Sequence, residues 1–281
     1  MHISFIAIAK SLAEVALPIL YVVTAIGYGL AFFKDDAFAR MWKSRLLLAT
    51  TITHFFYIGL HTAQEGHCMV TTPFEMMSLV AFTLIATYTL IEFRTNVKGT
   101  GFFLVTLAGL FELVSSVMLK VTPGGEMNPV LSNLGIGLHV TAAIFGFGGI
   151  AISAVYGLLY LLLFRELKRS DFGNFFKHLP SLEALEQLNT ASSIIGFAFL
   201  TVAISIGAFW LPRIFVNFSY ADPKLIATAL VWAVYAAVLF AKYVVRLDGK
   251  RVISLSLGGF VLAIFSLTVV NAFFSHFHKF Y

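Results

Sequence analysis

Apolar residues occur in long stretches along this chain, and short polar segments separate them. A membrane-spanning α-helix needs about 20 consecutive, mostly apolar residues. Stretches of this kind recur along the whole sequence. The pattern therefore predicts an all-α fold, a polytopic membrane helix bundle with about eight transmembrane helices. The predicted spans are residues 15–33, 46–62, 75–92, 101–119, 136–163, 191–211, 225–245 and 253–275.

Two segments do not fit the simple alternation of span and short loop. Residues 1–14 carry Lys10 and Glu14 four positions apart, so they form either a surface helix or an extension of the first span. The longest link, residues 164–190, is charged, partly amphipathic and interrupted by Pro180. Neither segment is large enough for a separate domain, and we expect one membrane domain over residues 1–281.

Composition strengthens the membrane assignment. Hydrophobic residues make up 59% of the chain and charged residues only 12%, whereas soluble domains carry about 25% charged residues. The net charge of +5 is then best explained by basic cytoplasmic loops, so we expect the lipid bilayer and no nucleic acid as a partner. The single cysteine, Cys68, excludes an internal disulfide. The N-terminus lacks the features of a cleavable signal, so it is expected to be the first helix.

The basic residues also predict an orientation. Of the 19 Lys and Arg residues, fourteen fall on the loops of one side of the predicted bundle and five on the other. Cytoplasmic loops carry the excess of Lys and Arg, so both termini are expected outside, in a multi-pass protein of a bacterial inner (cytoplasmic) membrane. The fourteen are Lys34, Arg40, Lys43, Arg45, Arg94, Lys98, Arg165, Lys168, Arg169, Lys177, Lys242, Arg246, Lys250 and Arg251.

This orientation gathers five of the eight histidines at or near the outer face. Imidazole binds iron, zinc and copper, and haem combines axial histidines with apolar and aromatic walls, which 30 Phe, 10 Tyr and 3 Trp can supply. Zinc prefers additional carboxylates or cysteines, and the predicted outer loops contain few of them. The alternative is that these histidines only mark the membrane interface. The five are His61, His67, His139, His276 and His278.

His54 and Glu112 are ionisable residues placed deep within predicted spans. His54 and His61 are seven residues apart, hence about 20° apart on one helix face and about 10 Å apart along its axis. At this separation the two histidines can serve one pathway but do not easily bind the same iron. Ionisable groups at such depth are functional candidates, although His54 can equally bond a neighbouring helix. Glu112 can be a buried neutral acid, a proton carrier or a histidine partner.

From about His139 to the end, the chain resembles the haem-handling family of cytochrome c assembly proteins, which includes CcsA, CcmC and the smaller HemX. The resemblance rests on the order and spacing of several motifs, and ATTITHFFYIGL with TTPFEMMSLVAF extends it back to about residue 45. The later motifs are LHVTAAIFGFGGIAISAVYGLLYLLL, LPSLEALEQLN, IGFAFLTVAISIGAFW, ADPK followed by Trp232 and Tyr235, GKR, and the stretch from Asn271 to His278.

The resemblance implies a haem b site at the outer face. Its iron ligands would be His139 and His278, with His276 a bystander, and a tryptophan-rich segment would face the haem. The matching stretch here, FVNFSYAD (residues 215–222), keeps aromatic side chains but not the tryptophans. The implied haem contacts are Phe209, Trp210, Phe215, Phe218, Tyr220, Asp222 and Lys224, with Lys224 and Arg213 as cations for the propionates.

The family also has an intramembrane histidine that matches His54. Its usual partner position, eight residues after Trp232, is Phe240 in this chain, so a second haem lacks its ordinary ligand. One ligand can remain, or His61 can substitute.

The resemblance therefore implies haem delivery or retention for cytochrome c assembly, with an apocytochrome c or an assembly protein as partner. CcsA-type proteins join haem vinyl groups to C-x-x-C-H thiols together with a partner, and the chain is not expected to be an enzyme alone. The alternatives are a HemX-like regulator of glutamyl-tRNA reductase acting through the cytoplasmic loops, a two-haem electron-transfer subunit, and a haem-free transporter with a proton relay.

Overall fold

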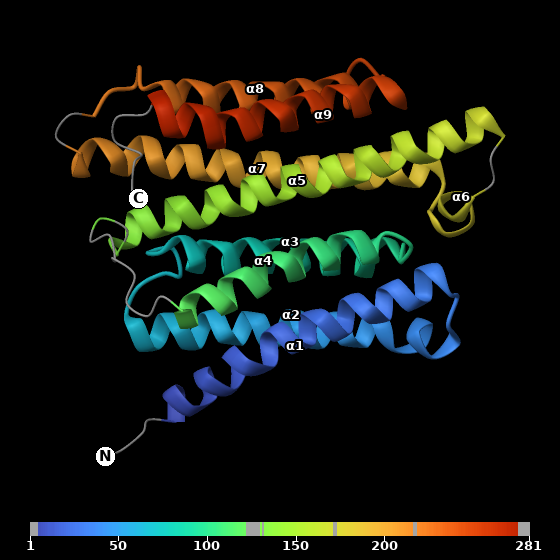
Figure 1. Ribbon diagram of the computed structural model, residues 1–281. Helices are drawn as coiled ribbons and strands as arrows, with labels where there is room; N and C mark the ends of the chain where they lie inside the picture. The colour runs from blue at the N-terminus through green and yellow to red at the C-terminus, as the bar shows by residue number, and fades with distance from the viewer. Residues whose placement is uncertain (1–4, 122–129, 131, 171–172, 216–217, 275–281) are drawn as a thin grey trace. The chain divides into compact units, whose positions relative to one another are not determined.

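The computed structural model describes every residue except 1–4, 122–129, 131, 171–172, 216–217 and 275–281. The described chain is helical and contains no strand, and eight of its helices are long and apolar enough to cross a membrane. The predicted all-α bundle with about eight spans is thereby confirmed (Figure 1). Contacts divide the chain into two compact units, residues 1–137 and 138–281, called unit 1 and unit 2 here.

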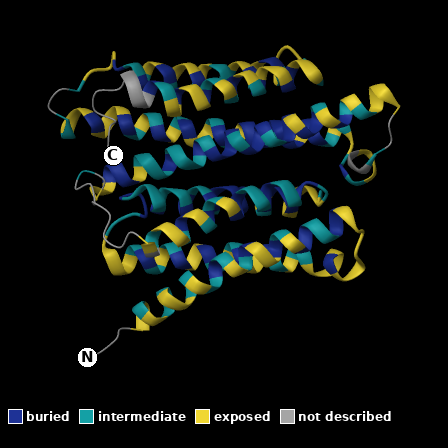
Figure 2. Ribbon diagram, viewed as in Figure 1, coloured by how far each residue is buried: buried dark blue, intermediate teal, exposed yellow. Residues whose placement is uncertain are grey.

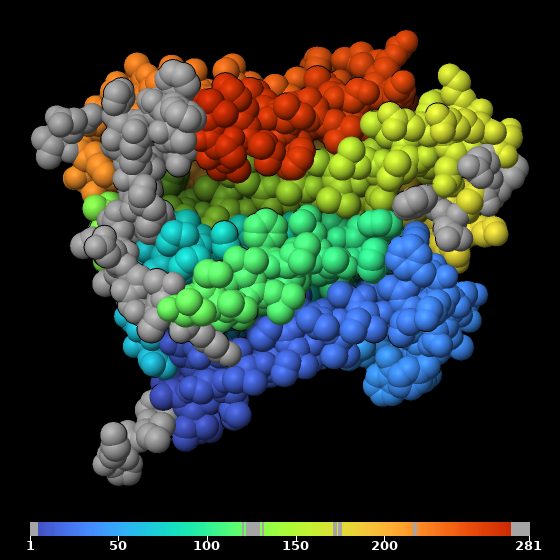
Figure 3. Space-filling model, in the orientation of Figure 1, coloured from blue at the N-terminus to red at the C-terminus, as the bar shows by residue number. Residues whose placement is uncertain are grey.

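Unit 1 is built from four long helices, each packed on two others. Helix α1 packs on α2 and α4, and α3 packs on α2 and α4; Figure 3 shows the side chains of α4 directly against those of α1. The helices are α1 (Phe5–Phe33), α2 (Ala37–Glu65), α3 (Pro73–Thr95) and α4 (Gly101–Val121).

Short capped connections set the helix ends of unit 1. Asp36 caps α2, and Gly66, with φ of 76°, ends it in the left-handed conformation that glycine adopts without steric cost. Thr72 and Glu75 then form a capping box at the start of α3, with Pro73 in its first turn. This tight turn fixes where the side chain of Glu75 lies.

The described part of unit 2 contains four spanning helices, the last of which changes type, and one short helix. They are α5 (Leu134–Arg169), α6 (Asn174–His178), α7 (Leu182–Ile214), α8 (Pro223–Tyr243) and α9 (Lys250–Phe265), which continues as the π-helix η1 (Ser266–Phe274). The first four residues of α5 belong to unit 1. In Figure 1, α5 begins at the end of unit 2 where α7 ends, α8 begins and η1 lies. Residues far apart in sequence therefore meet at this end.

Helices α5 and α7 approach each other through glycines. A Cβ atom on Gly149 would lie 2.6 Å from the backbone nitrogen of Gly196, so no larger residue fits. The close approach lets Ser153 and Ser193 hydrogen-bond at 2.8 Å, and Asn189 donates to the Ser153 carbonyl at 2.7 Å. Small residues and interhelical hydrogen bonds are the usual basis of helix association in lipid.

Figure 2 shows buried and exposed residues alternating along the spanning helices. The exposed side chains include large apolar ones such as Phe55, Phe93 and Val261. In water such a surface would aggregate, whereas in a bilayer it faces hydrocarbon. Burial and hydropathy thus agree that this is a multi-span membrane protein.

Several helices extend beyond the predicted spans. Helix α1 begins at Phe5, so residues 5–14 extend the first span instead of forming a separate surface helix. Helix α7 begins at Leu182, so the LEALEQLN part of the predicted link is its first two turns. The Ser181 side chain caps this helix, which explains why a polar segment starts a span.

Candidate functional site

His139 lies near the start of α5, with its imidazole against α7. Its Nδ1 is 2.8 Å from the carbonyl oxygen of Ala203. A carbonyl only accepts, so Nδ1 carries the proton and Nε2 of the neutral ring keeps its lone pair. A Cβ on Gly207 would lie 2.8 Å from Cε1 of this ring, so a glycine at this position leaves room for the imidazole. His139 is thus oriented as metal-ligating histidines usually are, with Nδ1 held by Ala203 and with no hydrogen bond from Nε2 to the described residues.

The last turns of α7 present aromatic surface at the same end of unit 2. Trp210 packs edge-to-face on Phe209, with 5.8 Å between ring centroids, and both are exposed to a substantial degree. The Arg213 guanidinium lies 3.5 Å from the centroid of Phe209 and also donates to the Phe209 carbonyl. An apolar face edged by a cation suits a flat ring that carries carboxylates.

The connection from α7 to α8 adds further aromatic side chains. Phe215 ends α7, and Phe218 packs perpendicular to Tyr220 with ring centroids 4.7 Å apart. Tyr220 is 67% exposed, and its hydroxyl donates to the Ala208 carbonyl at 3.4 Å. These predicted haem contacts therefore lie next to the end of α7.

The two charged candidates after this connection have structural partners. Asp222 caps α8 by accepting from the backbone nitrogen of Lys224 at 2.8 Å. The Lys224 ammonium donates to the Ser266 carbonyl at 2.9 Å and so links α8 to η1. Single turns of π-helix often occur at functional sites, and η1 leads toward His276 and His278, which lie outside the described residues.

His54 is fully buried in unit 1, and both of its ring nitrogens are hydrogen-bonded. Nδ1 lies 2.9 Å from the Tyr21 hydroxyl and Nε2 lies 3.1 Å from the hydroxyl of Ser78. Ser78 in turn donates to Glu112 at 2.7 Å. Because the Ser78 hydroxyl donates its proton to Glu112, its oxygen accepts a hydrogen bond from Nε2 of His54. Nδ1 of His54 then accepts from the Tyr21 hydroxyl. The relay connects four helices, and Nε2 of His54 is 3.9 Å from Glu112.

The sequence singled out His54 and Glu112 but missed Tyr21 and Ser78. Tyrosine and serine are common in helices and give no signal of this pairing, which depends on how α1 and α3 are placed along α2. Phe240, at the position of the family's usual second ligand, is 57% exposed on α8 of unit 2.

Comparison with known proteins shows the family of the chain. The family described as "Cytochrome C assembly protein" matches residues 11–278. The chain is 24% identical to Protein HemX of Brevibacillus brevis, over 81% of this chain and 83% of that protein. It is 24% identical to the cytochrome c biogenesis protein CcsA of Trieres chinensis, over 89% and 90%, and 23% identical to the inner membrane protein YpjD of Escherichia coli (strain K12), over 70% and 74%. The chain belongs to the cytochrome c assembly protein family.

Proposed function

We propose that this protein handles haem for cytochrome c assembly in a bacterial cytoplasmic membrane. It holds haem b at the outer face, with both termini outside, and it works with an apocytochrome c or an assembly partner. Both units serve this one task as a single haem-handling membrane domain over residues 1–281. The observation that carries the proposal is the orientation of His139, with Nδ1 fixed by Ala203 and Nε2 making no hydrogen bond to the described residues.

The residues around His139 fit a haem. His139 would be one axial ligand and His278 the other, against the aromatic surface of Trp210 and the α7–α8 connection. Arg213 is exposed beside that surface and would pair with a propionate, while Lys224 keeps two further N–H donors beside its bond to Ser266. Haem, when bound, supplies an iron that accepts imidazole at its axial positions.

The chain's own contribution is then to bind, orient and shield. The Ala203 bond fixes the tautomer of His139, and such partners typically change metal affinity by about 10- to 100-fold. The aromatic surface excludes water from one face of the ring system. Both ring nitrogens of His54 are already hydrogen-bonded. We therefore propose one haem at the outer site and none bound by His54.

The test is the haem content of the detergent-purified protein, from its oxidised and reduced spectra and the pyridine haemochrome. Wild type is expected to hold about one haem with a bis-histidine b-type spectrum. His139→Ala and His278→Ala should each lower haem occupancy by about tenfold or shift the spectrum. His276→Ala and His178→Ala are the matched controls and should leave it unchanged. Equal loss in all four variants, or loss in none, would contradict the assignment.

A further inference from the structure

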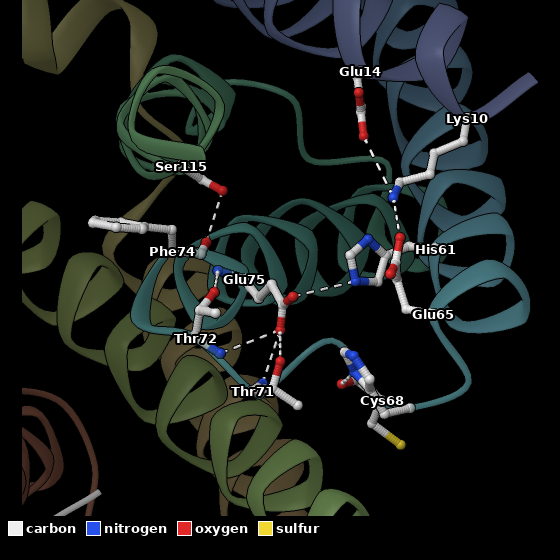
Figure 4. A network of polar contacts seen from close by, with 11 residues as sticks. Lys10, Glu14, His61, Glu65, Cys68, Thr71, Thr72, Phe74, Glu75 and Ser115 are labelled. Carbon is white, nitrogen blue, oxygen red and sulfur yellow. Dashed lines mark hydrogen bonds and ion pairs between the residues drawn. The ribbon is translucent and has the colours of Figure 1, made fainter. Parts of the chain in front are cut away.

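A second cluster of metal-ligating side chains lies at the other histidines of unit 1, where α2 ends and α3 begins. His61 and Glu75 are buried and His67 is half-buried, and the ligand atoms of all three lie within 4.8 Å of one another. Nε2 of His61 is 3.3 Å from Oε1 of Glu75 (Figure 4). The cluster was not expected from the sequence, which counted Glu75 as part of a span and grouped His61 and His67 only with the other outer-face histidines.

Two members of this cluster, Glu75 and His67, are each held by hydrogen bonds to the atom that is not needed as a ligand. Oε2 of Glu75 accepts from the Thr71 nitrogen and hydroxyl, both at 2.8 Å, and from the Thr72 nitrogen at 3.2 Å (Figure 4). Nδ1 of His67 lies 3.0 Å from the Cys68 carbonyl, so it carries the proton and leaves Nε2 as the ligand atom. Metal ligands are typically oriented by outer partners of this kind.

His61 is the member that most needs a further partner. Its side chain is only 6% exposed, and neither ring nitrogen makes a hydrogen bond to the described residues. A buried polar atom without a hydrogen bond is costly. The 3.3 Å approach of Nε2 to Glu75 does not have hydrogen-bond geometry, whereas a cation between the two atoms would satisfy both.

The local charge also favours a cation. Lys10 lies 2.7 Å from Glu65 and 3.8 Å from Glu14, so its single positive charge is shared by two carboxylates (Figure 4). Glu65 follows His61 by one turn of α2, and Glu75 adds a further carboxylate. The group therefore has a formal excess of negative charge that a divalent cation would offset.

We propose that His61, His67 and Glu75 form a binding site for a divalent transition-metal ion of the Zn²⁺ type, separate from the haem site. Two imidazoles and one carboxylate are a ligand set that zinc accepts with a fourth position left to water. The ligand atoms of one zinc ion lie about 3.4 Å apart, so small side-chain rotations would bring the three ligand atoms to this distance.

The neighbouring thiol and haem are poor alternatives for this site. The sulfur of Cys68 points away from His61 and Glu75 (Figure 4), and burial raises the pKa of this thiol, which disfavours the thiolate that binds metals. A haem iron needs its axial ligands on opposite faces of a wide flat ring. A Glu75 oxygen lies within 4.8 Å of a ring nitrogen of each histidine, a position that so wide a ring would have to occupy.

The test uses full-length, haem-free protein in detergent, purified without a histidine tag and stripped with a chelator. Competition against a chromophoric zinc indicator should show one tight Zn²⁺ per chain. His61→Ala, His67→Ala and Glu75→Gln should each weaken Zn²⁺ binding by about tenfold or more. Cys68→Ser and His178→Ala should bind as wild type does. The assay contains no haem, so its outcome is independent of the proposed function.

Two results would overturn the proposal. One is wild-type affinity in all three variants, which would make His61 and Glu75 a plain ion pair. The other is a sulfur ligand at about 2.3 Å in the X-ray absorption spectrum of the zinc-loaded protein, in place of nitrogen and oxygen at about 2.0–2.1 Å. Thermal unfolding of the metal-free variants separates misfolding from lost ligation, and Glu75→Gln keeps the shape of the side chain for this comparison.

Discussion

The two units hold their helices together in different ways. In unit 1, polar side chains meet in the interior, as in the His54–Ser78–Glu112 relay and around Glu92. Glu92 accepts from Tyr28 and Tyr88 at 2.6 Å and from Ser44 at 2.7 Å. In unit 2, α5 and α7 press backbone against backbone at Gly149 and Gly196, and the interhelical hydrogen bonds beside this contact come from neutral serine and asparagine side chains.

The same contrast separates the histidines. Both ring nitrogens of His54 in unit 1 hydrogen-bond to side chains of other helices. In His139 of unit 2, Nδ1 bonds the Ala203 carbonyl, and Nε2 makes no hydrogen bond to the described residues. Under the proposed function, the hydrogen bonds that a histidine already makes, and not its depth alone, decide whether it is available as a ligand. The following variants test this comparison.

The largest effect is expected at Glu92. Glu92→Leu removes the acceptor of three hydroxyl groups and leaves them buried without a partner, which should lower the free energy of unfolding by about 2–4 kcal/mol. Glu92→Gln keeps one acceptor oxygen and should lower the free energy of unfolding by less than half as much. The measurement is thermal or denaturant unfolding in detergent. If Leu and Gln behaved alike, the polar interior of unit 1 would not be what holds it together.

A smaller effect is expected between α5 and α7. Gly149→Ala places a methyl group against the Gly196 backbone, and overpacking of this kind costs about 1–3 kcal/mol. Gly258→Ala is the matched control, because its Cβ would meet nothing within 4 Å. The unfolding temperatures of the two variants give the comparison. A Gly149→Ala protein as stable as the control would mean that the helices separate at no cost.

The smallest effect on haem is expected at His54. Because both nitrogens already serve Tyr21 and Ser78, His54→Leu should leave haem per chain unchanged while lowering stability by about 1 kcal/mol. The pyridine haemochrome assay of His139→Ala is the matched comparison. Loss of haem from His54→Leu alone would reveal a second haem and favour the electron-transfer alternative.

Much of the fold followed from the sequence, because about 20 apolar residues in a row have few alternatives to a spanning helix. Helix ends were less predictable. The start of α7 at Leu182 depends on the Ser181 cap, and the LEALEQLN segment is too polar to count as a span. Hydropathy measures the average character of a segment and does not register a single cap.

The candidate sites were predictable only in part. His139 stands out by its place at the start of a span, but its free nitrogen depends on Ala203 and Gly207, which carry no chemical signal of their own. The pairing of His61 with Glu75 depends on the capping box of α3, which turns the carboxylate toward α2. Such pairings arise from helix register, and one sequence alone does not reveal it.

The polar interior of unit 1 has a consequence for how the chain is made. A carboxylate entering a bilayer is costly unless partners are present. The partners of Glu92 lie on α1, α2 and α3 itself, and those of Glu112 lie on α3 and α4 itself. Glu75 likewise bonds Thr71 and Thr72 and faces His61. Glu75, Glu92 and Glu112 of unit 1 thus each emerge from the ribosome with or after the groups that hold them, so in synthesis from the N-terminus none of these three carboxylates has to wait for a helix not yet made.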